Sequence, residues 1–110
     1  FVIKRLLSNF IRKSITIKWP NDLMYNKNKV CGILQETITY NQKIFLITGV
    51  GLNTNVVPKT KSFPATSLKN IIKKKVENKK ILRDIQKRYE KFLIEVKSCS
   101  YKQLKKNLKN

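Results

Sequence analysis

Residues 14–55 alternate between apolar, β-branched segments and short polar turns, and this pattern restricts the fold more than any other feature of the chain. Ile15 and Ile17 alternate with polar neighbours, as in a half-buried strand, and Pro20 ends that strand. Short polar turns join consecutive strands in antiparallel sheets. The segment therefore predicts an antiparallel meander, with strands at residues 14–19, 23–25, 30–40 and 43–55, the last of them buried.

Helical periodicity flanks the meander on both sides. Residues 1–13 carry an apolar stripe at helical spacing. After a polar, proline-bounded loop at residues 58–64, Thr66 or Ser67 is a candidate cap for a second helix, and Asn78 for a third. A short last helix is predicted on Tyr101, Leu104 and Leu108. This order predicts an α+β fold, with an antiparallel or mixed sheet backed by helices.

The chain is strongly basic, with 25 Lys and Arg against 6 Asp and Glu, a net charge of +19. Such a charge is compatible with a polyanionic partner. The lysines are scattered rather than patterned, however, and no aromatic stacking motif of RNA-binding domains accompanies them. A composition rich in Lys, Asn and Ile explains the charge more simply, so nucleic acid is not the favoured partner.

Cysteine and histidine content excludes several kinds of site. The chain has no His, and Cys31 and Cys99 are too far apart for a zinc ribbon or a CxxC motif. No apolar run approaches the roughly 18 residues that a membrane span requires. A cytoplasmic enzyme is the simplest expectation.

Three clusters between residues 18 and 55 have residue types suited to chemistry. Residues 18–22, Lys-Trp-Pro-Asn-Asp, place an amide and a carboxylate at the end of a strand. Residues 29–36, Lys-Val-Cys-Gly-Ile-Leu-Gln-Glu, contain a glycine inside an apolar strand, which often marks a bulge or a bound ligand. Residues 49–55, Gly-Val-Gly-Leu-Asn-Thr-Asn, would let a flat ligand lie against the backbone, but lack the third glycine of a dinucleotide fingerprint.

Taken singly, the first cluster is explained by an ordinary turn and the second by a solvated surface lysine, and the third is weak evidence. Taken together, their order and spacing resemble the biotin–protein ligase family, and residues 64–68, Pro-Ala-Thr-Ser-Leu, resemble its next segment. The resemblance implies part of a class II synthetase-like catalytic core. On this interpretation residues 1–68 form the motif-bearing part of the catalytic domain, and residues 69–110 a helical segment of the same domain.

The resemblance implies a two-step reaction with ATP, Mg²⁺ and biotin. Biotin and ATP form biotinyl-5′-adenylate, and a lysine of a biotin carboxyl carrier protein then attacks the adenylate. Lys29 would contact the biotin carboxylate and the α-phosphate, where negative charge develops. The other implied roles are biotin binding by Gly32 and Leu34, adenine or ATP binding by Asn53, Asn21, Lys18 and Gly51, and coordination of Mg²⁺ or orientation of the attacking lysine by Asp22.

Strict alternation along a strand would put Lys29 on the opposite face from Gly32 and Leu34. A bulge near Gly32 would bring the three residues to one face.

One element of the family pattern is absent. The chain has three glycines, at positions 32, 49 and 51, so it contains no Gly-Arg-Gly-Arg loop. We expect that loop upstream of Phe1, which would make this chain a fragment with weak activity or none by itself.

Other functions remain open from the sequence. A lipoate–protein ligase shares the fold, although the Trp-Pro-Asn-Asp string argues against it. A basic nucleic-acid-binding module and a non-catalytic remnant are further alternatives, and an open sheet edge would permit a homodimer.

Overall fold

The computed structural model describes residues 2–60 and 62–98. The chain divides into two compact units. One spans Lys13–Val76 and contains the sheet, and the other combines the N-terminal helix with the helix that follows Glu77.

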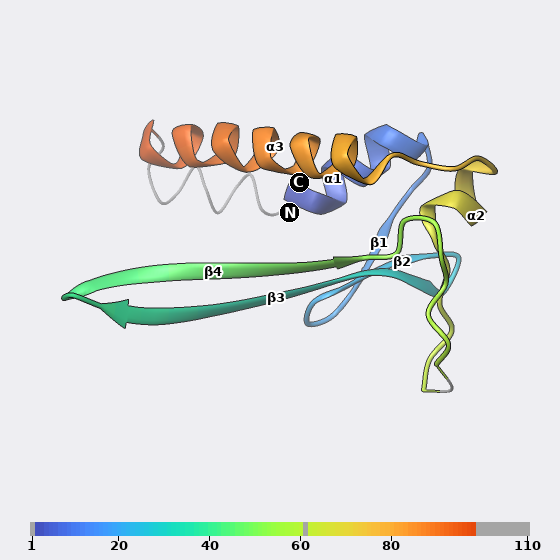
Figure 1. The fold of residues 1–110 in the computed structure, drawn as a ribbon, viewed down its shortest axis with the longest axis horizontal. Coiled ribbons are helices and arrows are strands. Elements are labelled where there is room, and N and C mark those ends of the chain that lie inside the picture. The colour runs from blue at the N-terminus through green and yellow to red at the C-terminus, as the bar shows by residue number, and fades with distance from the viewer. Residues whose placement is uncertain (1, 61, 99–110) are drawn as a thin grey trace. The chain divides into compact units, whose positions relative to one another are not determined.

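The first unit is built on a four-stranded antiparallel meander in the order β1-β2-β3-β4. The long β3–β4 hairpin extends well beyond the two shorter strands (Figure 1). The predicted meander and the α+β class are both confirmed. The strands are β1 Thr16–Lys18, β2 Asp22–Tyr25, β3 Asn28–Tyr40 and β4 Lys43–Leu52.

Both hairpins of the meander turn through two residues. Tyr25 pairs with Asn28 across the first turn, and Tyr40 pairs with Lys43 across the second. Positive φ at both central residues defines a type I′ turn, whose twist matches that of the flanking strands. These angles are 47° and 65° at Asn26 and Lys27, and 49° and 63° at Asn41 and Gln42.

The far half of the β3–β4 hairpin is exposed on both faces. Ile44 and Leu46 are 77% and 63% exposed, and Ile38 and Phe45, which pair across the hairpin, are 44% and 45% exposed. The prediction that this strand is buried is therefore wrong. Apolar content shows that a strand can be buried, but burial requires a covering layer, and no other described part of the Lys13–Val76 unit covers these side chains.

Helix α2, Leu68–Ile72, closes the first unit. Ser67 is its N-cap, and the Ser67 hydroxyl accepts a hydrogen bond from the Asn70 N–H at 3.2 Å. Of the two predicted caps, Ser67 is thus the one used. Lys73 ends the helix in the left-handed conformation, with φ of 65°.

The second unit contains α1, Val2–Ile11, and α3, Asn78–Ser98, which contact each other. The buried residues of α1 follow the predicted helical stripe, and Arg12, with φ of 54°, ends the helix. Asn78, the predicted cap, is instead the first residue inside α3, so the helix begins one residue earlier than predicted. Cys99 and the predicted helix on Tyr101, Leu104 and Leu108 lie outside the described residues.

The first hairpin turn offers a test of the fold. Lys27→Gly should raise the free energy of unfolding by roughly 0.5–1 kcal/mol, because glycine adopts positive φ without the steric cost of a Cβ. Chemical denaturation measures the change. Lys87→Gly, at an exposed site of α3, is the control and should lower stability by about 1 kcal/mol. Equal destabilisation by both substitutions would contradict the turn assignment.

Candidate functional site

Four residues from the three motifs form one row across the sheet. Lys18 pairs with Asp22, Asp22 with Gly32, and Gly32 with Gly51. Directly paired residues of neighbouring strands share a face of the sheet. The meander therefore brings these four residues together on one face, and two of them are glycines that leave the backbone uncovered.

A β-bulge adds Lys29 to the same face. Leu23 pairs with Cys31 and the next residue, Met24, pairs with Lys29, so Val30 is an extra residue in β3. Without it, Lys29 and Gly32 would face opposite sides of the sheet. The bulge that would bring Lys29 to the face of Gly32 and Leu34 is therefore present, and Val30 itself is fully buried.

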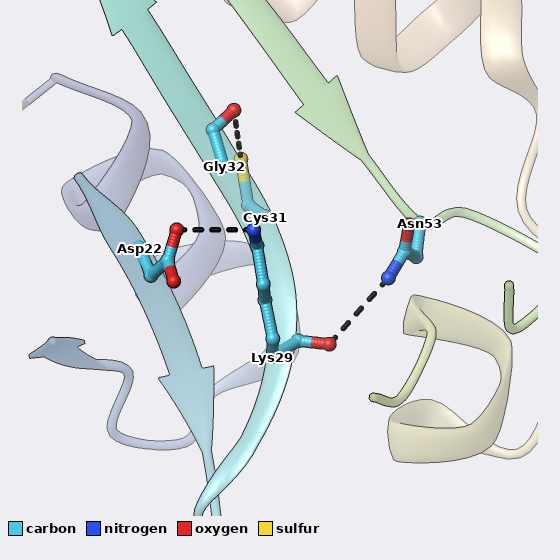
Figure 2. Close-up of polar contacts among 5 residues, drawn as sticks. All are labelled: Asp22, Lys29, Cys31, Gly32 and Asn53. Atoms are coloured by element: carbon cyan, nitrogen blue, oxygen red, sulfur yellow. Dashed lines mark hydrogen bonds and ion pairs between the residues drawn. The ribbon is translucent and has the colours of Figure 1, made fainter. Parts of the chain in front are cut away.

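Hydrogen bonds on both sides hold the backbone of Lys29. Its N–H donates to the Pro64 carbonyl at 2.9 Å, and its carbonyl accepts from the Thr66 N–H at 2.9 Å. The Asn53 side chain donates to the Lys29 carbonyl at 3.4 Å (Figure 2). It also donates to the Thr66 carbonyl at 3.0 Å. The segment around Ala65 thus lies beside Lys29 as a short parallel bridge.

The side chain of Lys29 is held as well. Its Nζ lies 3.1 Å from Oδ1 of Asp22, and the two side chains point toward one another from β3 and β2 (Figure 2). The ammonium also lies 4.8 Å from the centroid of the Phe63 ring. A Cβ on Gly32 would come within 3.2 Å of both Cε and Nζ of Lys29. Glycine at position 32 therefore gives the lysine room to lie along the sheet.

An open cleft of about 290 Å³ lies on this face. It contains a cation, an aromatic ring and bare backbone, which suits a ligand with an anionic group and a flat part. The lining residues are Lys29, Gly32, Gly51, Leu52, Asn53, Pro58 and Phe63.

The remaining predicted site residues lie farther from the cleft. Leu34 follows Gly32 on the same face and is 67% exposed. Lys18 is exposed at the β1 end of the row. Asn21 precedes β2, and its backbone carbonyl accepts a hydrogen bond from the Ile33 N–H at 2.9 Å.

Sequence reasoning missed two residues. Phe63 lies in a segment that was expected to be an ordinary surface loop, and only its position beside Pro64 could have indicated a role. The second is Asn55, whose side-chain amide makes two hydrogen bonds to the backbone of Val76. Its Nδ2 donates to the Val76 carbonyl at 2.9 Å, and its Oδ1 accepts from the Val76 N–H at 2.8 Å.

Cys31 lies on the other face of the sheet, in the row formed with Leu23 and Leu52. Burial raises the pKa of its thiol from 9.0 to about 12; the nearby charge of Lys29 lowers the pKa and that of Asp22 raises it. The thiol therefore stays protonated at neutral pH and is a poor nucleophile.

The described residues contain no group of three or more His, Cys, Asp or Glu side chains able to hold a metal ion. Within the same residues, no helix is long and apolar enough to cross a membrane.

Comparison with known proteins identifies related ligases. Residues 2–55 match the Biotin/lipoate A/B protein ligase family. The bifunctional ligase/repressor BirA of Bacillus subtilis (strain 168) is 33% identical over 88 residues, which cover 70% of this chain and 26% of the relative. The corresponding BirA of Bacillus spizizenii is 32% identical over the same length and covers the same shares.

Solved structures extend the similarity to the fold. The biotin protein ligase of Aquifex aeolicus in complex with biotin and ATP has a TM-score of 0.76 at 29% identity, covering 96% of this chain and 45% of that one. The Leishmania major enzyme in complex with biotinyl-5-AMP has a TM-score of 0.59 at 27% identity, covering 76% and 34%. This chain thus spans less than half of either structure.

The family match and the similarity in fold place the chain in the class of the biotin and lipoate protein ligases. Within that class, the chain belongs to the biotin protein ligase family.

The two hydrogen bonds between the Asn55 side chain and the Val76 backbone predict a structural role for Asn55. Asn55→Ala should lower the free energy of unfolding by about 1–3 kcal/mol, because the N–H and carbonyl of Val76 both lose their partner. Asn28→Ala is the control, since it removes only a 3.3 Å hydrogen bond in an exposed turn. Urea denaturation should show a smaller loss of unfolding free energy for the control. Equal losses would contradict the structural role of Asn55.

The buried thiol predicts a pH dependence. Because the pKa of Cys31 is about 12 in the folded protein against 9.0 normally, its contribution to stability is fully present below pH 9 and is lost as the pH rises toward 12. Stability should therefore fall less between pH 8 and pH 10.5 in Cys31→Ala than in the wild type. Alkylation at pH 9, followed by peptide mass spectrometry, should modify Cys31 only after denaturation.

Proposed function

We propose that this protein attaches biotin to a lysine of a biotin carboxyl carrier protein, using ATP and passing through biotinyl-5′-adenylate. The observation that carries the proposal is the placement of Lys29. The β-bulge at Val30 turns the Lys29 side chain to the face of the cleft, and hydrogen bonds hold its backbone. Gly32 leaves room for the side chain, so the ammonium lies over exposed backbone at the open cleft.

In the first step of the proposed reaction, the biotin carboxylate attacks the α-phosphorus of ATP and pyrophosphate leaves. Both reacting groups are anionic, and negative charge builds on the phosphate oxygens as the new bond forms. A fixed cation stabilises that charge without having to reorganise during the reaction. We assign this role to Lys29, which would contact both the carboxylate and the α-phosphate.

The residues around Lys29 are assigned to different parts of the ligand. We assign Gly32 and Leu34 to biotin, since one supplies bare backbone and the other continues the same face with an apolar side chain. We assign Asn53, Gly51, Lys18 and Asn21 to the adenylate or ATP. The hydrogen bonds of Asn53 to two backbone carbonyls would fix it at the end of the cleft beside the adenine.

Asp22 has two proposed roles. Its ion pair orients Lys29 in the structure, and in the second step it would orient the attacking lysine of the carrier protein. Its carboxylate also fits as a single ligand to a Mg²⁺ ion that enters with ATP, because Mg²⁺ is commonly held by one or two carboxylates together with substrate phosphates.

We further propose that this chain is part of a larger ligase. It spans 47% of the Aquifex aeolicus apo structure, and it lacks the family's Gly-Arg-Gly-Arg loop. Residues 1–68 would then form the motif-bearing part of the catalytic domain, residues 69–110 its helical continuation, and the cytoplasm its compartment. The exposed apolar hairpin and the β4 edge would contact the rest of the domain or a second copy.

Biotin-dependent ATP–pyrophosphate exchange tests the proposal. In the full-length protein, Lys29→Ala should lower exchange by at least 100-fold, because the charge that stabilises the phosphate oxygens is removed. Lys27→Ala, an exposed lysine two residues away, should leave exchange unchanged. Wild-type levels in Lys29→Ala would overturn the assignment of this lysine.

The family description also includes lipoate ligases. Lipoate should therefore be offered in competition with biotin in the same assay. Support of exchange by lipoate but not by biotin would replace biotin as the substrate while leaving the adenylation chemistry intact.

A further inference from the structure

Phe63 contacts the lysine at the centre of the site, although it belongs to none of the three motifs. The ring centroid lies 4.8 Å from Nζ of Lys29, within the roughly 6 Å over which a cation is attracted to an aromatic face. The ring is 38% exposed and lines the cleft, so it is a partly solvated wall and not a core side chain.

The backbone around Phe63 makes this contact a fixed feature. The next residue, Pro64, accepts the hydrogen bond from the Lys29 N–H at 2.9 Å. Thr66 donates to the carbonyl of the same lysine at 2.9 Å. The segment that carries the ring is therefore attached to the residue whose ammonium the ring contacts.

Three groups surround the ammonium of Lys29. The Asp22 carboxylate lies at 3.1 Å, the Phe63 ring contributes its electron-rich face, and the Gly32 backbone leaves room beneath. A lysine ammonium has three N–H donors. Asp22 takes one of them, so donor capacity remains for an anion that enters the cleft.

We propose that Phe63 is a positioning residue, which holds the Lys29 ammonium in place through its aromatic face and thereby sets the affinity of the cleft for the carboxylate of the substrate. The proposal rests on the proposed function for the identity of that carboxylate. A lysine stem is long and flexible, and a fixed ammonium binds an anion more tightly because less freedom is lost on binding.

Graded fluorination separates this role from simple packing. Fluorine withdraws electron density from the ring face and changes the shape of the ring little, so it weakens the cation–π attraction. In the full-length protein, Phe63→4-fluorophenylalanine and Phe63→trifluorophenylalanine should raise the KM for biotin in steps, and Phe63→Leu should raise it about three- to tenfold. Phe63→Tyr should retain near-wild-type behaviour. A KM that stays flat across the series would overturn the proposal.

The matched control uses a similar contact elsewhere in the sheet. Nζ of Lys13 lies 5.7 Å from the ring centroid of Tyr25, away from the residues that line the cleft. Tyr25→Leu should leave the KM for biotin unchanged. An equal rise in Tyr25→Leu and Phe63→Leu would assign the effect to general loosening of the sheet and overturn the positioning role.

A second readout does not depend on ligase activity. The Phe63 ring should shift the ε-methylene protons of Lys29 upfield in the NMR spectrum, and Phe63→Leu should abolish that shift. An unchanged shift would overturn the proposal. If the full-length wild-type protein shows no biotin-dependent exchange, the proposed function fails, and the ring-current shift alone decides whether Phe63 positions Lys29.

Discussion

The geometry of the site depends on one extra residue in a strand. Val30 is inserted between two ladder pairs, and this insertion transfers Lys29 to the face that carries Asp22, Gly32 and Gly51. Every later feature of the site follows from it. The ion pair with Asp22, the contact with Phe63 and the close approach to Gly32 all require the lysine on that face. A strand of regular register would point the same lysine away from the cleft.

Polar side chains around the site mainly serve the backbone. Asn53 and Asn55 donate to backbone carbonyls, and Ser67 caps a helix. Partly buried N–H and carbonyl groups need partners, and these side chains supply them where regular pairing ends. They join the end of β4 to the segment beside Lys29 and to Val76. Asn53, which belongs to the third motif and lines the cleft, therefore also holds together the backbone beside Lys29.

The far half of the β3–β4 hairpin differs from the site in how its apolar side chains are exposed. Near Gly32 the sheet buries Leu23, Val30 and Cys31, whereas its far half exposes apolar side chains on both faces. Large exposed apolar areas are unusual on a free surface and commonly mark contact with further protein. This agrees with the limited share of the related ligases that the chain spans.

The sequence alone was sufficient for the strands and the turns, because hydrophobic alternation and polar turn residues are local properties of the chain. Helix caps are local as well, and they narrowed the cap of α2 to Thr66 or Ser67, of which Ser67 is the one used. The bulge near Gly32 had a different basis, because it was the condition under which the roles implied by the family resemblance fit one face of the strand. Burial of the hairpin could not be predicted, since exposure depends on what covers a strand and not on its own residues. Nor could the sequence show that Phe63 lies against Lys29, 34 positions earlier in the chain. That contact exists only because the segment at residues 64–66 pairs with the bulged strand, and such long-range pairing is decided by tertiary structure.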